Sequence, residues 1–180
     1  MTLWTAGHGK RAAEELVALL DAASIGLLVD VRRYPVSRRN PQFTRDRLEA
    51  SLLAHGVSYQ WWGDALGGRR SPASHATRHP AWTDTAFRTY ADHMDRPEFR
   101  HVFSHLLALA ADQRTVILCA ETRWEQCHRR LLSDAAALAG TPVTHLIAPG
   151  RAEGHRLHPA LRRGEDGWPV YDLGAPPELG

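Results

Sequence analysis

Short apolar runs alternate with stretches of helical periodicity along most of the chain. The run from Ile25 to Val31 is almost continuously apolar, which is typical of a strand buried on both faces. After Pro97, apolar residues follow the i, i+3, i+4 and i+7 spacing of a helix with one buried face. The pattern predicts strands at 3–6, 25–31, 57–61, 115–120 and 143–147, and helices at 11–23, 44–55, 83–94, 97–110 and 127–139.

This alternation is typical of an α/β domain, in which helices pack on both faces of a mostly parallel sheet. We predict a single domain over residues 1–147, with about five strands in its sheet. The segment 62–82 is rich in Gly, Ser, Pro and His, and we expect a long loop there. Residues 148–180 are rich in Gly, Pro and charge, which predicts a loosely packed tail.

The composition limits the classes of partner and location. The 180 residues include 22 basic and 20 acidic side chains, and a net charge of +2 does not by itself indicate nucleic-acid binding. No apolar run approaches the roughly 20 residues that span a bilayer, and the N-terminal residues lack the pattern of a secretory signal. Two cysteines exclude a disulfide framework. We therefore expect a cytoplasmic protein with no membrane partner, and the sequence leaves the oligomeric state open.

Reactive residue types follow several of the predicted strands. Ligands of parallel sheets bind at the carboxyl ends of the strands, so these residues are the first candidates for a site. They are His8, Asp30, Arg32, Cys119 and Glu121, together with Cys127, His128 and Arg129 at the start of the next helix. We expect them to meet around a single cleft, although they are far apart in the sequence.

Three groups of residues resemble the domain-of-unknown-function 488 family of small bacterial proteins. The groups are Thr5–His8 with Leu28–Arg32, Pro35–Phe43 with Leu66–Arg70, and Cys119–Glu121 with Cys127–Arg129. Their order along the chain makes the resemblance specific, and it extends from about residue 3 to residue 147. The family name records that its activity was not established. The resemblance therefore implies a shared site whose chemistry it does not define.

The basic and amide residues favour an anionic partner. Arginine forks bind phosphates and carboxylates, and amide side chains can also read base edges. The candidate substrate-binding residues are His8, Arg32, Arg38, Arg39, Asn40, Gln42, Arg69, Arg70 and Arg129. We predict a phosphate-bearing small molecule or a nucleic acid, that is, a nucleotide, a nucleoside or a nucleic-acid base.

One enzymatic interpretation assigns the chemistry to a carboxylate. Glu121 or Asp30 would be the acid–base or nucleophilic group in cleavage or transfer at a glycosidic bond. His128 and Arg129 would stabilise the charge that develops. Asp30 has a structural alternative, because a carboxylate at the end of a buried strand can form a salt bridge with Arg32.

A second interpretation assigns the chemistry to a thiol. Cys119 ends a buried strand, as in the rhodanese arrangement, and Cys127 lies at a predicted helix N-terminus, where a thiolate is stabilised. Either thiol could support sulfur transfer or phosphate-ester hydrolysis. Cysteine phosphatases, however, have an arginine six positions after the nucleophile, whereas Glu125 stands six positions after Cys119. A third alternative is a nucleic-acid-binding module without catalytic activity.

No cofactor or metal is predicted. The GxGxxG fingerprint and the P-loop are both missing from the sequence, so we expect no dinucleotide or triphosphate cofactor. His8, Cys119, Cys127 and His128 are residue types that bind metals. The cysteine spacing fits neither a CxxC redox pair nor a zinc ribbon, so we do not favour a metal site.

Overall fold

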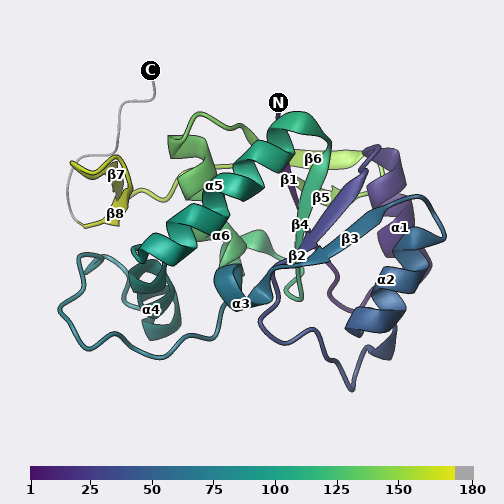
Figure 1. The fold of residues 1–180 in the computed structure, drawn as a ribbon, viewed down its shortest axis with the longest axis horizontal. Helices are drawn as coiled ribbons and strands as arrows, with labels where there is room; N and C mark the ends of the chain where they lie inside the picture. Colours follow the sequence, from purple (N-terminus) through teal and green to yellow (C-terminus); the bar gives the residue numbers. More distant parts are fainter. Residues whose placement is uncertain (173–180) are drawn as a thin grey trace.

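The computed structural model describes residues 1–172, and most of their strands join one sheet (Figure 1). Five parallel strands and one antiparallel strand at the edge form this sheet in the order β3-β2-β4-β1-β5-β6. The strands are β1 (Leu3–Gly7), β2 (Leu27–Asp30), β3 (Ser58–Trp61), β4 (Thr115–Cys119), β5 (Val143–Ala148) and β6 (Arg151–Gly154). The predicted α/β domain with a mostly parallel sheet is therefore confirmed.

Helices cover both faces of the sheet, and each face has its own hydrophobic cluster (Figure 1). The helices α1 (Ala13–Ala22) and α2 (Arg45–Leu53) pack on one face, and α5 (Pro97–Asp112) and α6 (Arg129–Leu138) pack on the other. The short α3 (Gly63–Leu66) and the longer α4 (Thr85–Met94) contact α5. Two 3-10 turns, η1 (Pro41–Phe43) and η2 (Trp124–Gln126), lie in the loops after β2 and β4.

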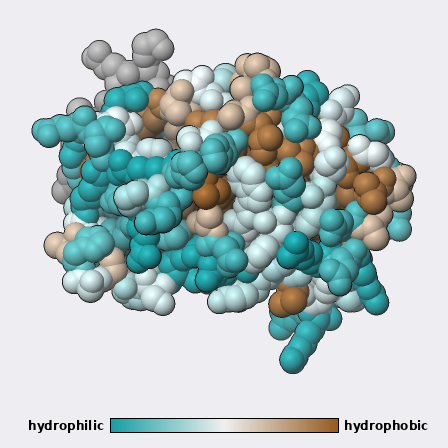
Figure 2. Space-filling model, in the orientation of Figure 1, coloured by the Kyte–Doolittle hydropathy of each residue, from teal (hydrophilic) through white to brown (hydrophobic). Residues whose placement is uncertain are grey.

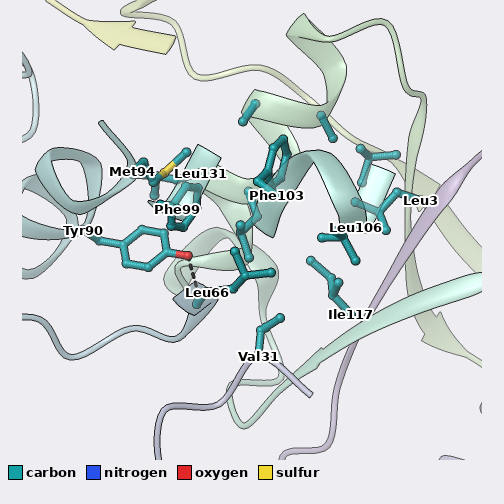
Figure 3. Packing of buried hydrophobic residues seen from close by; sticks show 14 of the residues in the cluster. Leu3, Val31, Leu66, Tyr90, Met94, Phe99, Phe103, Leu106, Ile117 and Leu131 are labelled. Carbon is teal, nitrogen blue, oxygen red and sulfur yellow. Dashed lines mark hydrogen bonds between the residues drawn. The ribbon is translucent and has the colours of Figure 1, made fainter. Parts of the chain in front are cut away.

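The amphipathic helix predicted after Pro97 supplies much of the core on the α5 side. Phe99, Phe103 and Leu106 of α5 are buried in the same cluster as Leu3 and Ile117 of the sheet (Figure 3). Pro97 occupies the first turn of α5, where its missing N–H costs no helical hydrogen bond. The helical spacing thus turns one continuous apolar face toward the sheet, as the sequence predicts.

Beside α5, Tyr90 of α4 is buried and donates a hydrogen bond of 2.6 Å from its hydroxyl to the backbone oxygen of Leu66 (Figure 3). This bond ties α4 to the end of α3, which lies within the segment 62–82 that the sequence predicts as a loop. On the face shown in Figure 2, exposed hydrophobic residues form scattered patches between hydrophilic ones. No helix within residues 1–172 has both the length and the apolar character needed to cross a membrane.

The chain beyond residue 148 packs more tightly than its composition predicts. It forms β6 and a separate hairpin of β7 (Leu161–Arg163) and β8 (Pro169–Tyr171). Leu161 and Tyr171 are fully buried in the cluster on the α5 side. Arg78 and Arg100 also form ion pairs with Asp166 between β7 and β8. A few well-placed apolar residues therefore anchor a segment rich in Gly and charge, and the prediction of a loose tail is wrong up to residue 172. Residues 173–180 lie outside the described residues.

Candidate active site

The predicted site residues meet at the carboxyl edge of the sheet, where β2, β4 and β1 are neighbours. The backbone N–H of His8 donates to the oxygen of Cys119, at 3.0 Å, so the loop after β1 runs beside the loop after β4. Gly7 makes this close approach possible, because a Cβ atom at residue 7 would lie 1.9 Å from the backbone oxygen of Glu121. Distant parts of the sequence are thus joined at one edge.

The structure separates these residues into two clusters, and the single cleft expected from the sequence is not observed. In the register of the sheet, Asp30 lies beside Leu118, so its side chain points toward α1 and α2. Cys119 is the next residue after Leu118, and it faces the α5 and α6 side. Side chains alternate along a strand, so an offset of one residue puts the carboxylate and the thiol on opposite faces.

The first cluster, named the carboxylate cluster, contains Asp30, Arg32, His8 and Tyr59. Arg32 donates to both oxygens of Asp30, from Nε to Oδ1 at 2.8 Å and from Nη2 to Oδ2 at 2.5 Å. The hydroxyl of Tyr59 also donates to Oδ2 of Asp30, at 2.8 Å. The remaining Nη1 of Arg32 donates to the backbone oxygen of Phe43 at 2.7 Å. Both carboxylate oxygens are therefore engaged by buried donors.

His8 completes the carboxylate cluster as a neutral side chain. Its ring is stacked on Phe43 with centroids 4.3 Å apart, and its Nδ1 lies 2.9 Å from the backbone oxygen of Gly9. A proton on Nδ1 leaves Nε2 to accept from Arg32, at 3.2 Å. Burial, above all, lowers the pKa of His8 to about 4. The cluster joins the loops after β1 and β2 to η1, and Asp30 and Arg32 form the structural salt bridge.

The second cluster, named the thiol cluster, contains Cys119, Cys127, His128 and Arg129. The sulfur of Cys127 lies 3.4 Å from Nε and 3.5 Å from the backbone N of Arg129, both of them donors. His128 lies between the two thiols, with its Nδ1 3.6 Å from the sulfur of Cys127 and 3.8 Å from that of Cys119. Its Nε2 is 3.2 Å from the backbone oxygen of Val31, and its Nδ1 faces the two sulfurs.

The two thiols have opposite tendencies to ionise. Burial opposes a charge on Cys127, but a hydrogen bond from Cys119 and the positive charges of His128 and Arg129 outweigh it. Together they hold the pKa of Cys127 well below that of an ordinary thiol. The hydrogen bond to Cys127, followed by burial, raises the pKa of Cys119. Cys127 is therefore the more acidic thiol of the pair, and Cys119 is its hydrogen-bond donor.

Cys127 precedes helix α6 rather than beginning it, because the helix starts at Arg129 with His128 as its N-cap residue. The backbone N–H of Arg129 points at the sulfur, which places the thiolate at a helix N-terminus, as the sequence predicts. Cys119 and Cys127 are brought together because η2 folds the connecting loop back on itself.

A buried chain of hydrogen bonds, named the Asp134 relay, extends from α6 to the thiol cluster. The carboxylate of Asp134 lies 2.8 Å from Nε2 of His155, and Nδ1 of His155 lies 3.0 Å from Nε2 of His145. Nδ1 of His145 is 2.7 Å from the hydroxyl of Thr5, which accepts from Nη1 of Arg129 at 3.4 Å. These five residues come from four parts of the fold, because Asp134 and Arg129 both belong to α6, whereas Thr5 lies in β1, His145 in β5 and His155 just after β6.

The carboxylate of Asp134 determines which atom donates and which accepts in each hydrogen bond of the relay. An ionised Asp134 only accepts, so His155 donates from Nε2 and accepts at Nδ1. His145 then donates from Nε2 and accepts at Nδ1 from the hydroxyl of Thr5, whose oxygen is left to accept from Arg129. Burial, the largest cause, lowers the pKa of His145 to about 3 and keeps the ring neutral. The relay thus holds Arg129, the donor to Cys127, in one orientation.

The other predicted residues lie outside both clusters. Glu121 has an exposed side chain, and its backbone oxygen accepts from Nη2 of Arg129 at 2.5 Å. Arg38 and Arg39 are exposed on the loop after β2. Asn40 is half-buried on the same loop, and Gln42 donates to the backbone oxygen of Arg11. Arg69 and Arg70 line a separate cavity of about 260 Å³ on the α5 side.

Several site residues escape sequence analysis. Thr5 and His145 lie inside strands and look like ordinary core positions, and Asp134 and His155 follow no motif in the sequence. Arg96 also lines the cavity with Arg69 and Arg70, yet it precedes a helix far along the chain. The sole signal for the relay is the unusual presence of buried polar residues in apolar surroundings, which becomes visible once the fold is known.

Two groups of described residues have ligand atoms close enough to share a metal ion. In the first, Cys119, Cys127 and His128 lie within 4.8 Å of one another, but the guanidinium of Arg129 beside Cys127 suits a bare thiolate better than a bound cation. In the second, His79 and Asp95 are hydrogen-bonded to each other, at 2.9 Å. A metal ion bound by all three side chains of either group would have to displace hydrogen bonds that these side chains already make.

Comparisons with known proteins agree with the motifs. The family model described as a domain of unknown function, DUF488, matches residues 12–136, which is more than half of the chain. A search of curated proteins and a search of solved structures each gave no match. The matched residues include both cysteines, the loop with Arg38 and Arg39, and the segment with Arg69 and Arg70. The chain therefore belongs to the DUF488 family.

Proposed function

We propose that this protein is a sulfur-transfer enzyme in which Cys127 is the nucleophile. One observation carries the proposal: the sulfur of Cys127 has two N–H donors of Arg129 and the ring of His128 within 3.6 Å. Charged donors around a buried sulfur stabilise the thiolate, which is the reactive form of cysteine. Among the interpretations of the sequence, this arrangement favours thiol chemistry.

Carboxylate chemistry has less support from the geometry. Both oxygens of Asp30 are engaged by Arg32 and Tyr59, so that carboxylate has no free lone pair aimed at a substrate. Glu121 is exposed, and a general base in open solvent gains little from its surroundings. A thiolate held by fixed donors is better prepared for reaction than either carboxylate.

Sulfur transfer also fits the thiol cluster better than phosphate-ester hydrolysis. Cysteine phosphatases hold the phosphoryl group with an arginine six positions after the nucleophile, whereas Ser133 stands six positions after Cys127 and Glu125 six positions after Cys119. Cys127 and Cys119 are 3% and 7% exposed, so a donor has to reach them with a small terminal sulfur. Cys119 adds a second sulfur beside the first, which can assist an atom moving between thiols.

The proposed reaction has two balanced steps. The thiolate of Cys127 attacks the outer sulfur of a donor, the S–S bond of the donor breaks, and the electron pair leaves with the departing group. Cys127 then holds the transferred sulfur as a persulfide. An acceptor thiolate attacks that outer sulfur, takes it away and restores the thiolate of Cys127. Nδ1 of His128 faces both sulfurs and is positioned to exchange protons with the thiols. A reducing cytoplasm, the location we propose, keeps both cysteines as free thiols.

Purified protein incubated with thiosulfate and cyanide tests this proposal. We expect thiocyanate to form, and mass spectrometry to show a gain of one sulfur atom on the protein when cyanide is omitted. C127S is expected to lose both signals, and C119S is expected to keep the mass gain. Glu121→Gln is the matched control for carboxylate chemistry and is expected to retain the activity.

The outcomes separate the candidate functions. Absence of the mass gain with thiosulfate and with glutathione persulfide would contradict sulfur transfer. A thiol of Cys127 that titrates like free cysteine would remove thiol chemistry altogether. Loss of activity toward a nucleoside or nucleotide in Glu121→Gln, with C127S unchanged, would restore the carboxylate interpretation.

A further inference from the structure

A cavity of about 260 Å³ lies near the thiol cluster, and four arginines line it. Arg33 comes from the loop after β2, Arg69 and Arg70 follow the glycine pair after α3, and Arg96 precedes α5. The four side chains therefore come from three separate segments of the chain. Arginines repel one another, so their convergence on one cavity needs an explanation.

Two of these arginines are held rigidly by backbone oxygens at the end of α3. Arg70 donates from Nε to Gly67 and from Nη2 to Asp64, both at 2.7 Å. Arg33 donates from Nη1 to the same backbone oxygen of Asp64, also at 2.7 Å. Among residues 1–172, no hydrogen bond uses Nη1 of Arg70 or Nη2 of Arg33. Fixed guanidiniums with unused donors are preorganised for an anion.

Acidic residues neutralise only part of the positive charge of the cavity. Asp92 lines the cavity, and Asp64 forms an ion pair of 3.3 Å with Arg33, so the four arginines keep an excess of positive charge. His93 also lines the cavity, and its pKa responds to this positive charge. Burial is the main cause that lowers the pKa of His93 to about 4. A hydrogen bond to the backbone oxygen of Ala65 opposes this shift, whereas the charges of Arg70, Arg96 and Arg33 add to it. Burial, followed by the charge of Arg33, likewise lowers the pKa of Arg70.

We infer that this cavity binds the tetrahedral anionic group, a phosphate or a sulfonate, of a small molecule. Planar guanidinium forks match the oxygens of such a group with paired hydrogen bonds. The volume is below the roughly 300–1,000 Å³ of typical sites for drug-sized ligands, so the ligand is small. Arg69 has a φ of 57°, an unusual value for a residue with a side chain, and such strain is often found at ligand sites.

The cavity adjoins the thiol cluster through one layer of residues. A Cβ atom at Gly68 would lie 3.1 Å from Nδ1 of His128, so the glycine before Arg69 contacts the ring between the thiols. The ring of Tyr90 lies 4.9 Å from that of His128 and 6.0 Å from that of His93. The anion site depends on its own contacts, but one part of the inference rests on the proposed function: the bound molecule is the sulfur donor, with its oxyanion among the arginines.

Isothermal titration calorimetry with inorganic phosphate, and separately with thiosulfate, tests the site. The measurements use the Cys127→Ser protein, in which no sulfur is transferred. We expect saturable binding of both ions and a loss of about tenfold or more in affinity in Arg70→Met and in Arg96→Met, because a charge-assisted hydrogen bond is lost. Arg96 is exposed and makes no side-chain hydrogen bond within residues 1–172, so its replacement leaves the fold intact. Arg47→Met, on the exposed face of α2, is the matched control and is expected to bind normally.

Each outcome decides one statement. Undetectable phosphate and thiosulfate binding, or equal affinity in all three arginine variants, overturns the anion site. Tighter binding of a single-stranded oligonucleotide than of phosphate, with the same dependence on Arg70 and Arg96, overturns the small ligand in favour of a nucleic acid. Phosphate binding without thiosulfate binding refutes the donor assignment and keeps the site. Sulfur transfer without anion binding refutes the anion site and leaves the proposed function standing. Anion binding without sulfur transfer refutes the proposed function and keeps the anion site.

Discussion

The Asp134 relay predicts that a hydroxyl inside β1 controls the acidity of a thiol that follows β4. Thr5→Val removes that hydroxyl and keeps the shape of the side chain. His145 then loses the donor at its Nδ1, and Arg129 loses the acceptor at its Nη1. Because the hydrogen bond from Nη1 of Arg129 to residue 5 no longer fixes the guanidinium, we expect Nε of Arg129 to move away from the sulfur of Cys127.

The size of the effect follows from the bond that is weakened. A hydrogen bond to a charged group contributes about 1.5–3 kcal/mol, and one pKa unit corresponds to about 1.4 kcal/mol. Losing most of the bond from Arg129 to the thiolate therefore raises the pKa of Cys127 by about one unit. The buried groups left without partners also lower the free energy of unfolding by about 1–3 kcal/mol.

The pKa of Cys127 can be measured from the ultraviolet absorbance of the thiolate as a function of pH. A Cys119→Ser background makes Cys127 the sole cysteine and keeps a hydroxyl donor beside it. Thr115→Val is the matched control, because Thr115 at the start of β4 is also fully buried but bonds to the backbone oxygens of Leu109 and Gln113. Both variants are expected to lose stability, and Thr5→Val alone to shift the titration. Equal pKa values in the two variants would refute the role of the relay.

Three further predictions concern stability. The pKa values of His8 and His145 are depressed to about 4 and about 3 in the folded state, so the unfolded chain binds protons first as the pH falls. Each histidine should therefore lower the free energy of unfolding by about 1.4 kcal/mol per pH unit between pH 6.5 and about pH 4. Urea unfolding at pH 7 and pH 5 checks this, and an unchanged midpoint would contradict it. Asp30→Asn leaves a buried guanidinium without its carboxylate and should cost about 3–5 kcal/mol in the same assay; a cost below about 1 kcal/mol would show that water reaches the bridge. Gly7→Ala places a Cβ atom 1.9 Å from a backbone oxygen and should lower the melting temperature, whereas Gly154→Ala, with nothing within 4 Å, should not.

Much of the fold could be predicted from the pattern of apolar residues. The continuous run before Asp30 and the helical spacing after Pro97 each led to the observed element, because burial on two faces and burial on one face leave different patterns. The hairpin after residue 160 could not be predicted in this way. Its buried Leu161 and Tyr171 and the ion pairs of Asp166 hold it within a polar segment, so its packing partners rather than its own periodicity determine that it folds.

The sequence predicts that the site residues lie at one edge of the sheet, but it does not predict that they form two clusters. The rule for parallel sheets placed His8, Asp30 and Cys119 together without knowledge of their contacts. Which face each side chain occupies depends on the register between β2 and β4, and the sequence contains no signal for it. The relay depends in addition on the antiparallel edge formed by β6, beyond which His155 reaches Asp134.

The separation into two clusters explains why two acidic groups at the same edge of the sheet, the carboxylate of Asp30 and the thiol of Cys127, have different roles. Asp30 faces the side where η1 and the loops after β1 and β2 must be joined, and its two oxygens are used by donors that hold those loops. Cys127 faces the side where α6 begins, and its donors come from a helix N-terminus and from one guanidinium. A carboxylate saturated with hydrogen bonds is stabilised as a spectator, because any reaction at its oxygens must first break them. A thiolate with fewer and longer contacts keeps lone pairs for attack, and the chemistry is therefore expected on the sulfur side of the sheet.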